Sequence, residues 1–327
     1  MKTFFSLLVI ILISASCAQQ QAGRVNLILD TDLGPDFDDV GAMALMHALA
    51  DSGYVNILAT VSSNGNELVA PCISVINHYF NRPDIPLGAP KGKAADMGDW
   101  HVVKWTEALP SRYPHSVSRT SDAEDAVRLY RRILASQPDR SVTICTIGFL
   151  TNMRNLLESE PDEFSPLGGR ELVALKVKRL ASMAGAFPEG REYNVFVDSM
   201  ASVAVFGGWP VEIVLSGFEI GVNILTGTRI VASPIENSPV KDTYTLCLAE
   251  QDFDGRMSWD QTAVLVAIKG YEPYFNTERG RIIVNENGSN SWSADPSGKH
   301  IRLIEKLPPQ EMAAIIEGYM MHQPVKN

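Results

Sequence analysis

The chain has 327 residues, 45% of them hydrophobic, which is enough for one large globular domain or two small ones. Its formal net charge is -10 and it contains no run of lysine or arginine, so nucleic acid and anionic membrane surfaces are poor candidate partners. Its 4 cysteines stand at wide spacings, which argues against a disulfide scaffold.

The N-terminus is predicted to be a targeting segment. Lys2 precedes the apolar stretch 4–13, which is too short to span a bilayer comfortably and is typical of a signal peptide. Residues 14–17 then resemble a bacterial lipobox that ends in Cys17, and cleavage near Ala18 is the alternative. Both interpretations predict export to the periplasm or cell envelope, and the first adds a lipid anchor at Cys17. The predicted boundaries are 1–17 for the signal peptide, 18–23 for a tether and 24–327 for the domain.

After the tether, strand-like and helix-like segments alternate. Strands are predicted at Val25–Leu29, Val55–Ser62, Val142–Ile147, Val177–Met183 and Glu212–Leu215. Helices are predicted at Val40–Ala50, Leu68–Phe80, Ala123–Ala135, Ser199–Val205, Asp260–Lys269 and Gln310–Met321. Continuous apolar strands separated by helices are typical of a parallel sheet with both faces covered. We therefore predict a single α/β domain with an open, mostly parallel, Rossmann-like sheet and helices on both faces.

An unusual concentration of acid follows the first predicted strand. Five aspartates fall within the ten residues from Asp30 to Asp39. A turn and a helix N-cap account for two of them at most. The other carboxylates need a counter-charge, and carboxylate oxygens are the ligands that Ca²⁺ or Mg²⁺ takes in proteins. The segment therefore predicts a metal site.

Polar clusters also follow the next strands, at residues 62–67, 148–152 and 185–194. In open parallel sheets ligands bind outside the carboxyl ends of the strands, where these loops converge. The clusters are therefore candidates for one site. In an extended conformation, Glu192 and Asn194 would face the same side of the chain. Asn64 either faces the site or supports the turn at Gly65.

Together these residues resemble the inosine-uridine preferring nucleoside hydrolases. The family signature is Asp-Thr-Asp-x-Gly followed by an Asp-Asp pair, here residues 30–34 and 38–39, with a spacing two residues longer than the commonest form. Further matches, in chain order, are Gly65-Asn66, residues 148–152, residues 192–194 and Trp259-Asp260. The resemblance runs from Arg24 to the C-terminus.

The resemblance implies hydrolysis of a ribonucleoside to free base and ribose with Ca²⁺ as cofactor. It implies that the metal ligands are Asp32, Asp39, Asp260 and the carbonyl oxygen of Ile147. Asp32 would also be the general base that holds the attacking water. The residues implied to bind ribose are Asp38, Asn66, Glu192 and Asn194. A 2′-deoxy sugar would leave ligand positions empty and should be strongly disfavoured.

The chain departs from the family pattern beside Asp260. Pyrimidine-accepting members often carry a His before this Asp, whereas this chain resembles purine-specific members in having Trp259 there. An indole can stack on a purine, so Trp259 is a candidate for activating the leaving base, with a plain core position as the alternative. A second aromatic wall is expected from Trp100, with Trp105 as a competitor. His101 is the alternative leaving-group acid.

Two other kinds of function compete with this interpretation. The loop from Gly185 to Glu192 is shorter than usual in the family, so the site could accept a substituted ribosyl compound as substrate. The short loop is also compatible with a surface lipoprotein that binds a ribonucleoside without turnover. A haloacid-dehalogenase-like phosphatase would need Thr or Val at the position of Gly34 and has no use for Asp38 and Asp39. A small-molecule ribonucleoside is thus the expected partner, and the sequence leaves open whether the chain forms a homo-oligomer.

Overall fold

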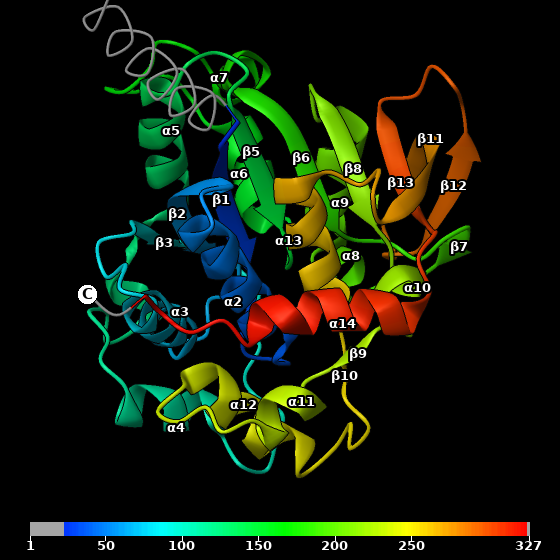
Figure 1. The fold of residues 1–327 in the computed structure, drawn as a ribbon. Coiled ribbons are helices and arrows are strands. Elements are labelled where there is room, and N and C mark those ends of the chain that lie inside the picture. The colour runs from blue at the N-terminus through cyan, green and yellow to red at the C-terminus, as the bar shows by residue number, and fades with distance from the viewer. Residues whose placement is uncertain (1–22, 326–327) are drawn as a thin grey trace, which may run out of the picture.

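A central sheet positions the site in the computed structural model, which describes residues 23–325 (Figure 1). The predicted signal peptide and Cys17 lie outside the described residues. The strands are β1 (Val25–Thr31), β2 (Val55–Ser62), β3 (Leu87–Ala89), β4 (Glu124–Asp125), β5 (Val142–Thr146), β6 (Val177–Met183), β7 (Glu189–Gly190), β8 (Glu212–Ser216), β9 (Leu225–Thr226), β10 (Arg256–Met257), β11 (Phe275–Val284), β12 (Asn290–Ala294) and β13 (His300–Glu305). Eleven of them form one sheet in the order β4-β3-β2-β1-β5-β6-β8-β13-β11-β12-β7, and β9 pairs with β10 apart from it.

Helices cover both faces of this sheet, as predicted. They are α2 (Asp38–Asp51), α3 (Val69–Tyr79), α4 (Trp105–Arg112), α5 (Ala126–Ser136), α6 (Thr151–Glu158), α7 (Gly169–Lys176), α8 (Tyr193–Val197), α9 (Ser199–Gly208), α10 (Phe218–Gly221), α11 (Thr228–Ala232), α12 (Pro239–Leu248), α13 (Trp259–Lys269) and α14 (Pro309–Met320). Within the described part of the chain, none is long and apolar enough to cross a bilayer. The fold is therefore the predicted single α/β domain.

The sheet is parallel from β4 to β13 and antiparallel from β11 to β7. Every predicted strand and helix is present within a few residues of its expected limits. Strands β11, β12 and β13 were not predicted. Of these, β13 lies between β8 and β11, and β11 pairs with both β13 and β12 in antiparallel orientation. These strands mix buried and exposed side chains instead of forming a continuous apolar run, so their signal in the sequence is weaker.

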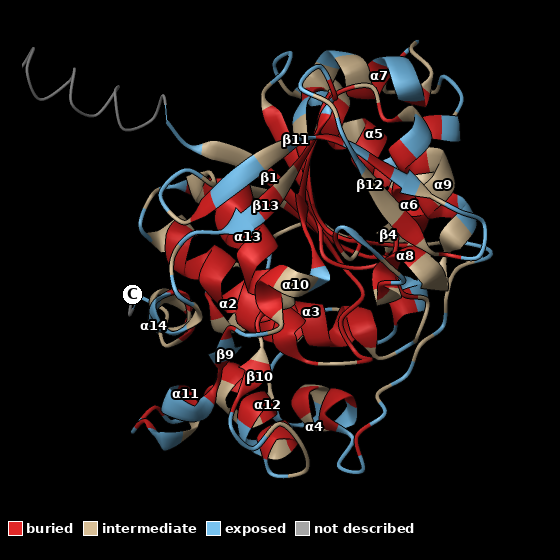
Figure 2. Cartoon of the chain, turned by 90° about the vertical axis from the view of Figure 1, so that its right-hand side faces the viewer, coloured by how far each residue is buried: buried red, intermediate tan, exposed pale blue. Residues whose placement is uncertain are grey.

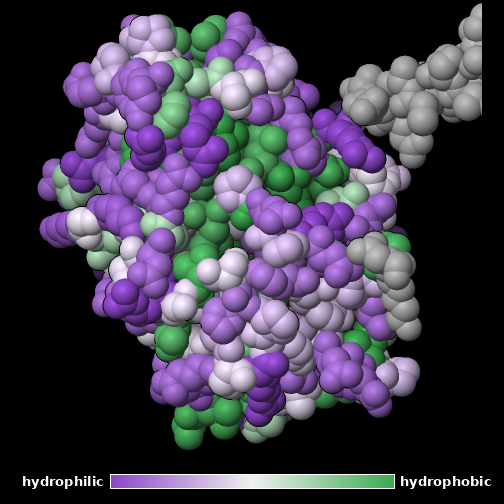
Figure 3. Space-filling model, turned by 90° about the vertical axis from the view of Figure 1, so that its left-hand side faces the viewer, coloured by the Kyte–Doolittle hydropathy of each residue, from purple (hydrophilic) through white to green (hydrophobic). Residues whose placement is uncertain are grey.

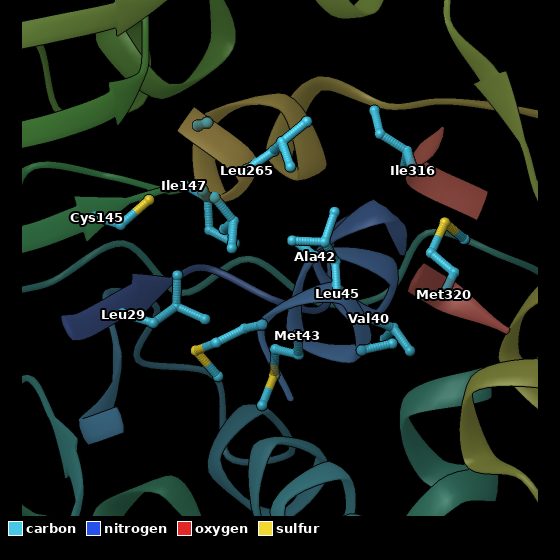
Figure 4. Packing of buried hydrophobic residues seen from close by; sticks show 14 of the residues in the cluster. Leu29, Val40, Ala42, Met43, Leu45, Cys145, Ile147, Leu265, Ile316 and Met320 are labelled. Atoms are coloured by element: carbon cyan, nitrogen blue, oxygen red, sulfur yellow. The ribbon is translucent and has the colours of Figure 1, made fainter. Parts of the chain in front are cut away.

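The largest cluster of buried hydrophobic residues joins α2 and α13 to β1, β5 and β6, and both helices are mostly buried (Figure 2). Every residue of α2 from Asp38 to Leu49 is buried, because α13 lies on one side of it and α14 on another. Figure 4 shows Leu29 and Cys145 of the sheet beside Met43 of α2 and Leu265 of α13. A helix that is apolar on all sides is stable only inside a protein. Because α2 is buried in this way, the position of its first turn relative to the sheet is fixed.

The outer edge of the sheet on the α3 and α5 side is short and charged. Its last strand, β4, has two residues, Glu124 and Asp125. A short edge strand with charged side chains offers little template for pairing with another chain. The surface on this side is mostly hydrophilic, with hydrophobic residues gathered in a band through its middle (Figure 3).

Candidate active site

The polar clusters meet at the carboxyl ends of β1, β5 and β6, where α13 begins. Residues of two of these clusters, 30–39 and 185–194, line a cavity of about 360 Å³. Eight of the predicted site residues line this cavity, namely Asp32, Asp38, Trp100, Ile147, Glu192, Asn194, Trp259 and Asp260. These residues are spread over more than two hundred positions of the sequence, and the parallel topology of the sheet brings them together.

The acidic segment turns directly from β1 into α2, so Asp38 and Asp39 occupy the first turn of a buried helix. One oxygen of Asp39 accepts from the Thr31 hydroxyl, and its other oxygen has no partner among the described residues. The backbone N–H of Asp260, in the first turn of α13, donates to Asp38 at 3.2 Å. Two helix N-termini therefore meet at the cluster, and their dipoles favour the negative charge there.

Like charge and burial oppose ionisation of these groups. Burial, followed by the neighbouring aspartates, raises the pKa of Asp32, Asp39 and Asp260 well above the ordinary value. Burial also raises the pKa of Asp38 to about 7, with Asp36 adding to the rise and Arg256 opposing it. A set of carboxylates this close is stable in its charged form only beside a cation.

The donor set fits a hard divalent cation. Asp36, Asp38 and Asp39 each offer one carboxylate oxygen, and these three atoms lie within 4.8 Å of one another. Arg256 already pairs with Asp36 and Asp38, whereas Asp39 has a buried oxygen without a partner among the described residues. Asp32 and Asp260 have no cationic partner among the described residues, and both line the cavity. Oxygen-only ligands of this kind suit Ca²⁺ or Mg²⁺.

Asp30 has a separate, structural role. Its carboxylate accepts from the Tyr130 hydroxyl at 2.8 Å and from the Asn152 amide at 2.9 Å. The same amide donates to the carbonyl oxygen of Ser62 at 2.8 Å, which ties α6 to the ends of β1 and β2. Burial nevertheless raises the pKa of Asp30 to about 7. This aspartate fixes the framework behind the cavity and does not line it.

Glu192 and Asn194 reach the cavity from the start of a helix, so the predicted extended conformation is wrong. Glu192 caps α8 by accepting from the backbone N–H groups of Gly185, Asn194 and Val195, at 2.7 to 3.1 Å. The Asn194 amide donates to the carbonyl oxygen of Met183 at 3.2 Å. The three hydrogen bonds that the Glu192 carboxylate accepts stabilise the helical conformation of the following residues over the extended one.

Three predicted residues, Asp39, Asn66 and His101, do not line the cavity. The Asn66 amide donates to Asp96 at 2.9 Å and its oxygen accepts from the backbone N–H of Leu68. The buried His101 ring contacts Asp99 through Nδ1 at 2.8 Å and the Gln251 amide through Nε2 at 2.6 Å. Because both ring nitrogens are engaged, the geometry gives no support to His101 as a leaving-group acid.

The tryptophan alternatives separate clearly by burial. Trp105 is completely buried in the core, whereas Trp100 is half exposed and lines the cavity. Trp259 also lines the cavity, and its indole N–H donates to the carbonyl oxygen of Phe218 at 2.8 Å. The Phe218 ring lies 5.1 Å from that of Trp259. The cavity is therefore lined by an aromatic pair as well as by carboxylates.

Asn64 turns out to support the loop. Its amide donates to the carbonyl oxygens of Asp32 at 3.0 Å and Met97 at 2.8 Å, and its oxygen accepts from the backbone N–H of Asn66. The side chain is fully buried. Of the two roles that the sequence left open for Asn64, these contacts match support of the turn and not a position facing the site.

Sequence reasoning missed Arg256, which lines the cavity. Its guanidinium pairs with Asp36, with Asp38 at 3.3 Å and with Asp252 at 3.1 Å, and it lies 5.2 Å from the ring centre of Trp259. The excess of aspartate in the sequence signals that some cation must compensate it. Nothing in the spacing says which of the 28 lysines and arginines does so.

Comparison with known proteins agrees with this geometry. The model of the inosine-uridine preferring nucleoside hydrolase family matches residues 27–311. The chain belongs to this family. A curated inosine-uridine preferring nucleoside hydrolase of Leishmania major is 25% identical over 197 residues, which are 58% of this chain and 59% of that protein. This chain matches 59% to 66% of the length of its curated relatives.

Solved structures of nucleoside hydrolases share the fold. A purine-preferring ribonucleoside hydrolase from Gardnerella vaginalis superposes with a TM-score of 0.69 at 15% identity, over 90% of this chain and 99% of that one. An inosine-guanosine nucleoside hydrolase gives a TM-score of 0.67 at 19% identity, over 92% and 100%. At these identities the likeness describes the architecture of the sheet and its helices.

Proposed function

We propose that this family member hydrolyses the N-glycosidic bond of ribonucleosides to free base and ribose. The observation that carries the proposal is one cavity lined by the carboxylates of Asp32 and Asp260 together with the aromatic pair of Trp259 and Phe218. Glycoside hydrolysis needs a carboxylate that directs water to the anomeric carbon and a means of stabilising the departing group. The carboxylates meet the first need, and the indole face meets the second for a purine.

Asp32, Asp39 and Asp260, with the carbonyl oxygen of Ile147, would hold Ca²⁺. When bound, Ca²⁺ would neutralise the carboxylates, orient water and accept two sugar hydroxyls in its remaining positions. Asp32 acts as general base and takes the proton of the attacking water. The carbonyl oxygen of Asp32 accepts from the buried Asn64 amide at 3.0 Å, which holds the loop that carries Asp32.

The sugar is recognised by the carboxylate of Asp38 and by Glu192 and Asn194, which line the same cavity. Glu192 is fixed by three backbone N–H groups, so it can accept from a sugar hydroxyl without reorganising. Trp259 stacks on the base and favours purines over pyrimidines, since a bicyclic ring covers more of the indole. Among the described residues that line the cavity there is no histidine to protonate the base.

Arg191 favours a second candidate substrate, a ribosyl compound with an anionic 5′ group. It lines the cavity next to Glu192, and its guanidinium lies 4.0 Å from the ring centre of Phe196. Its Nε donates to the carbonyl oxygen of Asn287 at 3.0 Å. Its terminal nitrogens make no ion pair with a carboxylate of the described chain. A phosphate would fit such a fork.

The test is release of free base by purified protein lacking residues 1–17, with and without Ca²⁺. The panel contains inosine, guanosine, uridine, 2′-deoxyinosine and inosine 5′-monophosphate. Cleavage of inosine and guanosine that requires Ca²⁺, with uridine and the deoxy compound spared, supports the first proposal. Faster cleavage of the monophosphate than of inosine supports the second candidate. Tight ribonucleoside binding without any base release would instead identify a binding protein.

We further propose that the protein is exported and lipid-anchored through Cys17, where it serves purine salvage at the cell envelope. The support is the lipobox-like segment 14–17. The test compares the wild type with Cys17→Ser after cell fractionation. The wild type is expected in the membrane fraction and the variant outside it. Equal distribution of the two proteins contradicts the anchor.

A further inference from the structure

A basic edge lies at the starts of the parallel strands, at the opposite end of the sheet from the candidate active site. Two hollows of about 680 and 540 Å³ adjoin there and share Pro210 and Lys299. We define the basic edge by five cations that line them, Arg140, Arg170, Lys178, Arg179 and Lys299. They come from segments far apart in the sequence, so no basic run announces them.

Strand register places these cations in one row. Asn26 of β1 pairs with Val142 of β5, which pairs with Val177 of β6. The row continues as Arg179 of β6 pairs with Glu212 of β8, and Lys299 directly precedes β13, whose His300 pairs with Ile213. Figure 1 shows α7, which carries Arg170, at this same upper end of the molecule.

The cations of the basic edge are not compensated. Among residues 23–325, none of the five has a carboxylate within 4.0 Å. Two of the carboxylates nearby already have other partners, since Asp139 pairs with Lys176 at 2.8 Å and Glu212 with Arg279 at 3.1 Å. Five such cations gathered in a chain of net charge -10 form a surface for an anion.

Uncharged donors extend this surface into the larger hollow. The indole N–H of Trp209 is buried and has no hydrogen-bond partner among the described residues, and the residue lines the hollow beside His300. A buried donor without a partner is costly, and a phosphate oxygen would satisfy it. The chemistry of the basic edge thus matches a phosphate-bearing ligand.

We propose that the basic edge docks on an anionic lipid surface, with the active-site cavity facing away from it. The N-terminal segment joins the fold at this same edge, because β1 begins at Val25 and Arg140 lies two residues before the partner of Asn26. The aspartate cluster lies at the far end of β1, about 20 Å away at ~3.3 Å per residue. That exceeds the Debye length of about 8 Å at physiological salt, so its charge is screened from the lipid. Net charge alone had made an anionic membrane a poor candidate.

Co-sedimentation with vesicles tests this docking without the lipid anchor. The protein begins at residue 18, which keeps all described residues, and the vesicles are phosphatidylcholine with or without phosphatidylglycerol. The variant is Lys178→Gln/Arg179→Gln/Lys299→Gln. A control with the same net charge, Lys93→Gln/Arg229→Gln/Lys306→Gln, removes exposed cations outside the basic edge.

Wild type and control are expected to bind the anionic vesicles and not phosphatidylcholine alone. The edge variant should bind roughly a hundredfold more weakly, at roughly fivefold for each cation near the surface. Both variants should retain the melting temperature of the wild type. Equal binding by the edge variant and the control overturns the proposal, as does absence of wild-type binding. Inorganic phosphate binding to the edge, without vesicle binding, also overturns it and indicates a small-anion site.

Discussion

The Arg256 guanidinium donates to the carboxylate of Asp38 at 3.3 Å, and both side chains are almost fully buried. The pair joins the start of β10 to the first turn of α2, and the two residues are 218 positions apart in the sequence. Asp36, the aspartate in the lengthened part of the signature, pairs with the same guanidinium. The extra carboxylate in this loop is thus compensated by a cation from a distant segment.

Arg256→Met should lower the free energy of unfolding by about 3 kcal/mol, because it leaves a buried carboxylate without its partner. Urea denaturation followed by circular dichroism measures this change. Asp36→Asn in the same background should restore part of the loss, since it removes one of the unpaired charges. An Arg256→Met variant as stable as the wild type would show that water compensates the carboxylates.

Asp32→Asn should lower kcat for inosine by at least about a thousandfold, since an amide cannot take the proton of the attacking water. Steady-state base release measures it. The control is Asp254→Asn, an exposed position outside the cavity lining, which should match the wild type. Far-ultraviolet circular dichroism should be the same for all three proteins. Wild-type turnover by Asp32→Asn would remove Asp32 from the mechanism.

Without metal, the protein should lose stability as the pH rises from 6.5 to 8. Burial raises the pKa of Asp30 and Asp38 from 3.8 to about 7 in the fold. Their contribution to stability is therefore complete below about pH 4, the unfolded pKa, and is lost as the pH rises through about 7. The buried His47 and His300, whose pKa values are lowered, change their contribution below pH 6.5, outside this window.

Thermal melting in EDTA and in Ca²⁺ checks this expectation. Ca²⁺ binds the charged carboxylates, so its stabilising effect should be larger at pH 8 than at pH 6.5. A melting temperature in EDTA that rises across this interval would contradict the assignment of the raised pKa values.

Trp259→Leu should lower kcat/KM for inosine by ten- to a hundredfold, which corresponds to about 1–3 kcal/mol of lost stacking on the base. Trp259→Phe is the matched variant, because it keeps an aromatic face and loses only the hydrogen bond to Phe218. It should retain most of the activity. Equal losses in both variants would mean that the indole acts by holding Phe218 and not by stacking.

The sequence by itself determined the architecture and the end of the sheet where the site lies. Continuous apolar strands can be buried only between helices, and this pattern is local enough to read from the chain. It also identified Asp32, Asp38 and Asp39 as members of one acidic segment, since so many carboxylates after one strand have few structural explanations, whereas Asp260 was joined to them only through the family resemblance. The antiparallel strands β11 and β12 escaped because a half-exposed strand has a weaker pattern.

Only the tertiary structure decided which charges meet. Arg256 reaches Asp38, and His101 is held between Asp99 and Gln251, through contacts between residues far apart in the sequence. Glu192 caps a helix because the following residues are helical and not extended. The basic edge likewise exists only because strand register lines up Arg140, Lys178 and Lys299. Composition records the sum of the charges, whereas electrostatic interactions depend on the distances between them, and the packed fold sets those distances.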